Sequence, residues 1–105
     1  MGVTTTPQIQ FASDKLAEFC ERNGVARLSL FGSVLTDRFS DKSDVDVLVE
    51  FQPGRRVGYL TMAALERELS SLFGGRKVDL RTPNELSPYF RDEVVNHASV
   101  QYAAL

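Results

Sequence analysis

The stretch from residue 44 to residue 51, Asp-Val-Asp-Val-Leu-Val-Glu-Phe, constrains the fold more than any other feature of the sequence. Its valines alternate with other residues, which is the period of a β-strand with one buried face. Because side chains alternate across a strand, Asp44 and Asp46 project from the same side, away from the valines. Two carboxylates held that close repel one another unless a proton, a partner or a cation neutralises them. The stretch therefore predicts a sheet with a charged site on one face.

A third carboxylate belongs to another predicted strand, at residues 77–81, where Val78 and Leu80 face one way and Asp79 faces the other. If the two strands are neighbours, Asp79 approaches Asp44 and Asp46. Three carboxylates on an open sheet face suit Mg²⁺, a hard cation that prefers oxygen ligands. Two such ions, roughly 3.5–4 Å apart, can hold the attacking and leaving oxygens of a phosphoryl transfer. A magnesium site is therefore one answer to the repulsion.

Gly32 and Ser33 follow a predicted apolar strand at residues 25–31. Glycine has no side chain to block the approach of the backbone to a phosphate. The Ser33 hydroxyl and the N–H groups beyond it lie where a short helix is expected, at residues 34–39, and a helix N-terminus attracts anions. A triphosphate could rest its tail on this turn, although an ordinary strand-to-helix turn has the same sequence.

The remaining patterns complete a small α/β (α+β) domain, with a small mixed β-sheet and helices packed on one face. A helix is expected from a Thr6 N-cap with Pro7 in its first turn to a Gly24 C-cap. The other expected elements are a helix at residues 59–73 that ends at Gly74, a capping box at Thr82-Pro83-Asn84-Glu85, a longer helix from Ser87-Pro88 to about His97, and a short closing strand at residues 99–103.

Length and composition predict a single domain over residues 1–105, with residues 1–6 as a disordered tail. The chain has 105 residues, 43% of them hydrophobic, which suffices for one core. The net charge of −2 gives no general attraction for nucleic acid or membrane, and no apolar run could span a bilayer. Cys20 cannot form an internal disulfide and shares an apolar helix face, so we expect it in the core. Together these features predict a cytoplasmic protein that binds neither membrane nor nucleic acid directly.

The spacing of these motifs resembles that of the minimal nucleotidyltransferases in the DNA polymerase β superfamily. Phe31-Gly32-Ser33 is followed by ten residues and then by Asp44-Val45-Asp46. The later segment Gly-Arg-Lys-Val-Asp-Leu-Arg-Thr-Pro, which contains Asp79, also matches, and the resemblance covers residues 28–83. It implies a polymerase β-like fold and a reaction in which a hydroxyl attacks the α-phosphate of a nucleoside triphosphate, expected to be ATP, and pyrophosphate leaves.

The resemblance also implies roles for individual residues. Asp44 and Asp46 would ligate two Mg²⁺ ions, and Asp79 would complete the catalytic-metal site and help to deprotonate the hydroxyl. Gly32 and Ser33 would hold the terminal phosphates. Small members of the family are commonly antitoxins paired with a HEPN-domain toxin, and some transfer AMP to a tyrosine of that toxin. Because a chain of this length has no acceptor-binding domain, we expect the partner protein to present the hydroxyl.

Two departures from the family pattern keep other functions open. Many relatives have a basic residue after Gly-Ser and a glycine four residues past the serine, where this chain has Val34 and Asp37. One alternative is a non-catalytic antitoxin that neutralises its toxin by occlusion. Another is a transferase that acts on a small hydroxyl substrate. Lys77 and Arg81 either offset charge at Asp79 or protect a sheet edge, and His97 is expected at a helix C-terminus or in solvent rather than in catalysis.

Overall fold

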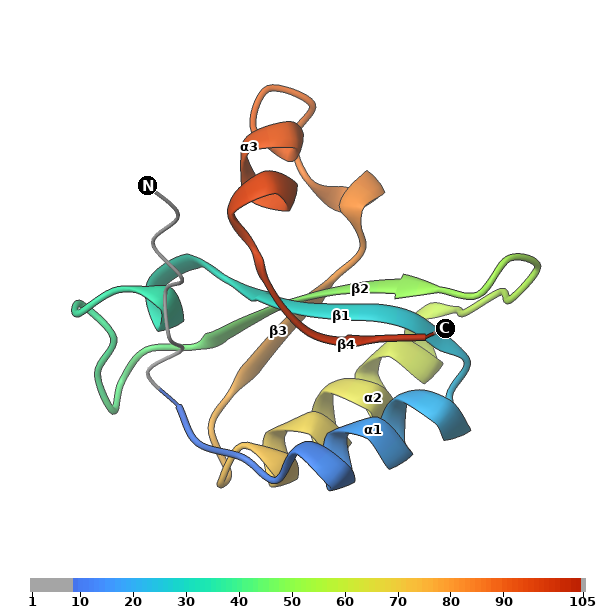
Figure 1. Ribbon diagram of the computed structural model, residues 1–105, viewed down its shortest axis with the longest axis horizontal. Coiled ribbons are helices and arrows are strands. Elements are labelled where there is room, and N and C mark those ends of the chain that lie inside the picture. Colours follow the sequence, from blue (N-terminus) through green and yellow to red (C-terminus); the bar gives the residue numbers. More distant parts are fainter. Residues whose placement is uncertain (1–8, 105) are drawn as a thin grey trace.

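The computed structural model of the chain describes residues 9–104 (Figure 1). In chain order its elements are α1 (Ser13–Arg22), β1 (Val25–Phe31), the 3₁₀ helix η1 (Gly32–Leu35), β2 (Val45–Phe51), α2 (Tyr59–Leu72), β3 (Val78–Arg81), the 3₁₀ helix η2 (Pro83–Glu85), α3 (Arg91–His97) and β4 (Ser99–Ala103). The predicted tail at residues 1–6 and the predicted cap at Thr6 and Pro7 lie outside the described residues. None of the helices described is long and apolar enough to cross a membrane.

The four strands form one mixed sheet in the order β3-β2-β1-β4. β1 is antiparallel to both β2 and β4, whereas β2 and β3 are parallel. A parallel pair needs a crossover connection, and α2 provides it. Figure 1 shows α1 and α2 side by side below the sheet and the short α3 on the opposite side. The predicted mixed sheet with its long helices on one face is confirmed, and so is the closing strand at residues 99–103.

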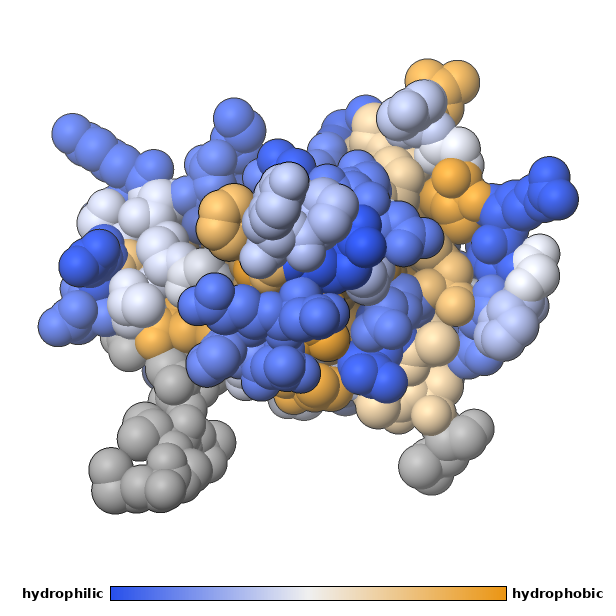
Figure 2. Space-filling model, turned by 90° about the horizontal axis from the view of Figure 1, so that it is seen from above, coloured by the Kyte–Doolittle hydropathy of each residue, from blue (hydrophilic) through white to orange (hydrophobic). Residues whose placement is uncertain are grey.

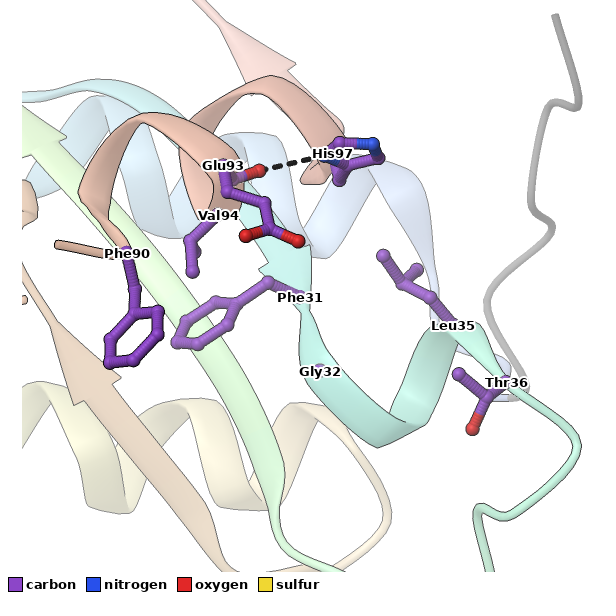
Figure 3. A pocket seen from close by; sticks show the side chains of 8 residues that line it. All are labelled: Phe31, Gly32, Leu35, Thr36, Phe90, Glu93, Val94 and His97. Atoms are coloured by element: carbon purple, nitrogen blue, oxygen red, sulfur yellow. Dashed lines mark hydrogen bonds between the residues drawn. The ribbon is translucent and has the colours of Figure 1, made fainter.

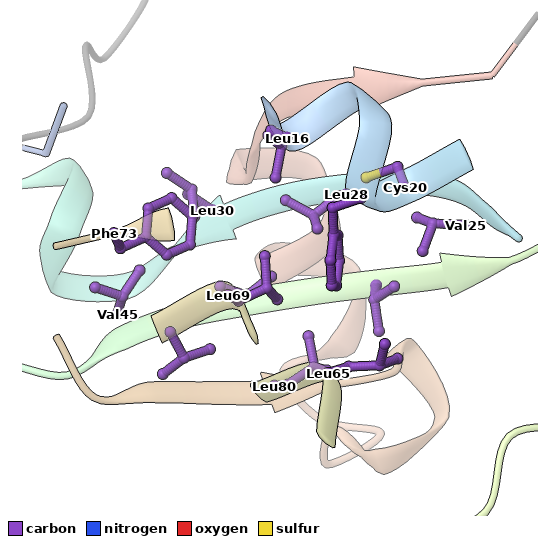
Figure 4. Close-up of a cluster of buried hydrophobic side chains, with 14 of the residues drawn as sticks. Leu16, Cys20, Val25, Leu28, Leu30, Val45, Leu65, Leu69, Phe73 and Leu80 are labelled. Carbon is purple, nitrogen blue, oxygen red and sulfur yellow. The ribbon is translucent and has the colours of Figure 1, made fainter. Parts of the chain in front are cut away.

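The hydrophobic core lies between the sheet and the two long helices (Figure 4). Val45, Val47 and Val49 of β2 are at most 1% exposed, so the alternation in the sequence does mark the buried face of this strand. Cys20 is fully buried in the same core, as predicted. Burial, with a smaller contribution from the charge of Glu21, raises the pKa of the Cys20 thiol to about 12, which keeps it protonated and unreactive. The other buried members are Leu16, Phe19, Val25, Leu28, Leu30, Val34, Leu65, Leu69, Phe73, Val78 and Leu80.

The first helix begins later than predicted, at Ser13 rather than ahead of Ile9. Ala12 is the N-cap residue and has an extended backbone, with φ −80° and ψ 114°. Phe11 instead packs edge-on against Phe73 at the end of α2, with ring centroids 5.2 Å apart. This long-range aromatic contact favours an extended lead-in over another helical turn. The predicted end is confirmed, because Gly24 follows the helix with a φ of +68°.

The short helix predicted at residues 34–39 is a 3₁₀ helix that begins earlier, at Gly32, and ends at Leu35. The helix ends at Thr36, whose backbone is extended, with φ −128° and ψ 165°. The Thr36 N–H makes the last helical hydrogen bond, to the Ser33 carbonyl at 2.9 Å, and the Thr36 hydroxyl also donates to that carbonyl, at 2.9 Å. Threonine often competes with helical hydrogen bonding in this way. The residues up to Asp44 form turns and loop, as expected for their polar sequence.

The long helix predicted from Ser87-Pro88 is also shorter, since α3 begins at Arg91. The capping box between Thr82 and Glu85 is present, but the helix that it starts is the single turn η2. The Arg91 guanidinium then donates to the backbone carbonyls of Pro83 and Leu86, at 2.8 and 3.1 Å. These contacts satisfy carbonyls that a longer helix would have used itself, and Pro88 disfavours a helical residue before it.

Glu66 of α2 completes the outer edge of the sheet. β3 is an edge strand, and the Glu66 carboxylate accepts the backbone N–H of Leu80 at 2.8 Å. Leu80 is only 5% exposed, so water has little access to this N–H. The side chain of a core helix therefore provides the hydrogen-bond acceptor that a fifth strand would otherwise supply.

We expect Glu66→Ala to lower the free energy of unfolding by about 1–3 kcal/mol, because a buried N–H loses a charged acceptor. Urea denaturation measures this change. Glu66→Gln is the matched control, since its amide oxygen can still accept the bond, and it should retain most of the stability. Equal unfolding midpoints for wild type and Glu66→Ala would show that the contact contributes nothing.

Candidate active site

Gly32 lies where β1 turns into η1, directly against the carboxylate of Asp46. Its φ is +76°, a backbone conformation that favours glycine. A Cβ built on Gly32 would collide with the Oδ2 atom of Asp46, closer than real Cβ atoms pack. The glycine predicted to cradle a phosphate and the aspartate predicted to bind a cation are therefore in contact. Ser33, the next residue, is the second residue of η1.

The sheet register brings two of the three predicted acids together. Asp46 is paired with Asp79 across β2 and β3, and Phe31, just before Gly32, is paired with Asp46 across β1 and β2. Asp46 and Asp79 thus lie on neighbouring strands, on the face opposite the buried valines. Figure 2 looks down on that side of the molecule and shows a mainly hydrophilic surface with separate hydrophobic patches.

Asp44 precedes β2 by one residue and is exposed. The pKa of Asp46 is raised above its ordinary value of 3.8, first by burial and then by the negative charges of Asp79 and Asp44, with Arg81 acting in the opposite sense. Both other carboxylates are therefore close enough to act on Asp46 electrostatically. This is the repulsion that the sequence predicts.

Asp46 and Asp79 share a sheet face and Asp44 lies in the loop just before β2, but the three carboxylates do not form a closed cage. Across residues 9–104, no group of three acidic, histidine or cysteine side chains is arranged to hold a metal ion. Arg81 donates to the Asp79 carboxylate at 3.3 Å, which confirms the predicted offset of charge at Asp79. The same residue ends the edge strand β3, where a basic side chain also protects the sheet edge. The donor set still fits Mg²⁺, which takes one or two protein carboxylates and completes its shell with water and phosphate.

A cavity of about 580 Å³ opens beside Gly32, between η1 and α3 (Figure 3). The rings of Phe31 and Phe90 line its apolar part, and Glu93 and His97 provide polar groups. His97 lies in the last turn of α3, where its Nδ1–H donates to the Glu93 carbonyl at 2.8 Å. The predicted position of His97 at a helix C-terminus is confirmed, and its place at the rim of a cavity is new.

Sequence reasoning missed the α3 side of this cavity. Phe90 is 60% exposed and Tyr89 is 91% exposed, which is unusual for large apolar or aromatic side chains. A pair of aromatic residues after Ser87-Pro88 is a weak signal, because the same pattern commonly marks a helix that packs into a core. Only the arrangement of α3 across from η1 shows that Phe90 lies beside Phe31 in a cavity that Gly32 also lines.

Comparison with known proteins agrees with this arrangement. Residues 13–100 match the family model described as "Nucleotidyltransferase domain". The chain is 34% identical, over 80% of its length and 87% of the relative's, to a protein of Methanocaldococcus jannaschii named "Putative protein adenylyltransferase MJ0435". A solved "Structure of putative minimal nucleotidyltransferase" superposes with a TM-score of 0.67 at 34% identity, covering 82% of this chain and 85% of that one.

A more distant solved structure has the same fold. It holds a "tri-AMPylated Shewanella oneidensis HEPN toxin in complex with MNT antitoxin" and matches with a TM-score of 0.62 at 20% identity, over 88% of this chain and 70% of the other. The chain belongs to the nucleotidyltransferase domain family. Within that family it is a minimal nucleotidyltransferase, an enzyme that catalyses nucleotidyl transfer.

We expect Gly32→Ala to abolish nucleotidyl transfer and to destabilise the fold by about 1–3 kcal/mol, because the methyl group adds a collision with Asp46 to the cost of a positive φ. Gly54→Ala is a matched control: Gly54, in the loop after β2, has a φ of +83°, but no surrounding atom lies within 4 Å of the place that a Cβ would take. It should lose stability and keep activity. Activity assays and thermal unfolding distinguish the two, and an active Gly32→Ala protein would contradict the contact.

We expect Asp46→Asn to raise the melting temperature of the metal-free protein at neutral pH while it removes activity. Because folding raises the pKa of Asp46, the ionised side chain lowers stability at pH values above that pKa. The gain should shrink as the pH falls from the raised pKa of Asp46 towards 3.8 and should vanish below 3.8, where the side chain is protonated in both the folded and the unfolded form. Scanning calorimetry at several pH values, with a chelator present, measures the difference. Asp37→Asn, at an exposed loop position, is the control, and a lower melting temperature for Asp46→Asn would refute the repulsion.

Proposed function

We propose that this enzyme transfers AMP from ATP to a hydroxyl of a partner protein, and that the partner is a HEPN-domain toxin. The observation that carries the proposal is the contact between Gly32 and Asp46, since it places the proposed phosphate-binding turn directly against the acidic site. Nucleotidyl transfer needs both parts within the length of a triphosphate. The name of the relative with 34% identity and the AMPylated HEPN toxin of the distant structure support protein AMP transfer as the reaction.

The residues of the site act on different parts of the triphosphate. Gly32 and Ser33 bind the terminal phosphates through backbone N–H groups and the serine hydroxyl. Asp44, Asp46 and Asp79 would hold two Mg²⁺ ions, which when bound neutralise the α-phosphate and the departing pyrophosphate. Asp79, on the neighbouring strand, accepts the proton of the attacking hydroxyl. The new bond joins that hydroxyl oxygen to the α-phosphorus, and the bond to pyrophosphate breaks.

The cavity beside Gly32 gives the acceptor access to this centre. It has room for an aromatic side chain and is lined by Phe31 and Phe90, which suit the ring of a tyrosine. One wall of the cavity is formed by α3, and Tyr89, two residues before that helix, is exposed. A partner that covers this surface would bring its hydroxyl next to the Asp46–Asp79 pair and would exclude water from the reaction.

A second candidate function is neutralisation of the toxin without catalysis. The position of Val34 favours it, because this side chain is fully buried and replaces a basic residue found after Gly-Ser in many relatives. Asp37 adds a negative charge to the exposed loop that follows. Both changes weaken the attraction for a triphosphate compared with those relatives.

Transfer of radiolabel separates the two functions. The protein is incubated with α-labelled ATP, Mg²⁺ and the product of the adjacent reading frame. An Arg-x4-His motif in that product would support its choice as the partner. We expect label on the partner and at least a 100-fold loss in Asp44→Asn and Asp46→Asn, because each removes a cation ligand. Asp37→Asn is the matched control and should retain transfer.

The contrary outcome is equally distinct. If wild type leaves no label on the partner and the Asp44→Asn and Asp46→Asn proteins still neutralise its toxicity, occlusion is the function. Label on a small alcohol in the absence of any partner would instead indicate a free-standing transferase.

A further inference from the structure

We propose that Arg76, outside the acidic site, is a positioning residue that holds Asp44 in place for cation and nucleotide binding. This inference rests on the proposed function and adds to it a residue with no direct role in the chemistry. Asp44 lies in loop, one residue before β2, so hydrogen bonding within the sheet does not fix it from both sides. Its neighbours must fix it.

The Arg76 side chain contacts the turn that precedes Asp44. Its guanidinium carbon lies 4.5 Å from the centroid of the Phe39 ring, over the ring face. One terminal nitrogen donates to the Ser40 carbonyl at 2.9 Å, and the other lies 3.3 Å from a carboxylate oxygen of Asp41. The Arg76 side chain is only 25% exposed although Asp41 is fully exposed, so the arginine is the inner member of this pair.

The Ser40 carbonyl links the Arg76 contact to Ser43. It also accepts the backbone N–H of Ser43 at 3.0 Å, and the Ser43 hydroxyl accepts the N–H of Ser40 at 3.0 Å. These reciprocal bonds close a four-residue turn whose first carbonyl is the one bound by Arg76. Ser43, immediately before Asp44, is therefore tied to the same carbonyl that the Arg76 guanidinium binds.

The residue on the other side of Asp44 is held by the neighbour of Arg76. The backbone N–H of Val45 donates to the Lys77 carbonyl at 2.8 Å, at the start of the β2–β3 pairing. Arg76 and Lys77 thus fix Ser43 and Val45, the two residues that flank Asp44. The same short segment leads into β3 and Asp79, so one piece of chain sets two of the three acids.

Arg76 is itself held by the end of α2. The Ser70 hydroxyl donates to the Arg76 carbonyl at 2.6 Å, and the N–H of Gly75 donates to the Ser70 carbonyl at 2.8 Å. Gly74 and Gly75 both have positive φ, which lets the chain reverse sharply after the helix. The guanidinium therefore projects from an ordered base and can order the loop rather than follow it.

Arginine is required here for its shape. A flat guanidinium can lie over an aromatic ring while its N–H groups donate outward in the guanidinium's own plane. A lysine ammonium cannot combine contact with the ring and this fixed pattern of donors. We expect Arg76→Met to speed hydrogen exchange of the Ser43 amide in the metal-free protein. We also expect it to weaken binding of a non-hydrolysable ATP analogue with Mg²⁺ by about tenfold, as is usual when a group that orients a metal ligand is lost. Arg76→Lys should fall between Arg76→Met and wild type.

Hydrogen exchange followed by NMR and calorimetric titration provide these two readouts. Arg67→Met is the matched control: it removes the same charge from an exposed position on α2 and should alter neither. Thermal unfolding checks that Arg76→Met is folded.

Each outcome decides a separate point. If the wild-type protein binds the analogue and Arg76→Met matches it in both readouts, the positioning role is refuted. If exchange at Ser43 rises while affinity stays at the wild-type value, the contact is local and the role is also refuted. If wild type neither binds the analogue nor transfers AMP, while hydrogen exchange at Ser43 is still faster in Arg76→Met, the proposed function fails. The contact of Arg76 with the turn at residues 40–43 then has a structural role alone.

Discussion

Electrostatic repulsion of the Asp46 carboxylate by Asp79, on the neighbouring strand, and by Asp44, just before β2, is the constraint on which the site depends. Asp46 cannot relieve it by moving, because Val45 and Val47 on either side are fully buried beneath the long helices. The strand next to it cannot give way either, since Phe31 is paired with Asp46 and Gly32 has its backbone against the carboxylate. The core therefore holds the acids in an unfavourable arrangement, and a cation with phosphate oxygens is the natural group to relieve it.

The parts that build the core also position the site. β2 presents valines to the helices and acids to the opposite face, so its packing determines both. α2 contributes core side chains, provides the Glu66 acceptor for the edge of β3, and ends in the turn that carries Arg76. Such dual use explains how a single sheet with two long helices can support a nucleotidyl-transfer site. It also explains why the acids lie on or beside strands, which hold them more rigidly than long loops would.

Local patterns in the sequence predict the elements whose period is strong and fail where a distant contact intervenes. The alternation of β2 and the glycine stops of α1 and α2 agree with the structure. The predicted start of α1 does not, because Phe11 packs on Phe73, which lies 62 residues along the chain from it. The helix predicted after the capping box likewise begins later than expected, at Arg91, whose guanidinium reaches back to the carbonyls of Pro83 and Leu86. In both cases a side-chain contact with residues outside the helix favours the later start.

The sequence by itself determined which residues form the acidic face and the glycine turn, because strand alternation and motif spacing are local properties of the chain. It also determined the family, through the spacing of Gly32-Ser33 from Asp44 and Asp46. Only the tertiary structure decided that Asp79 pairs with Asp46, that Phe90 and Gly32 line one cavity, and that Arg76 binds the turn before Asp44. Those contacts join residues from separate elements, and their geometry depends on sheet order and helix packing, which no local pattern records.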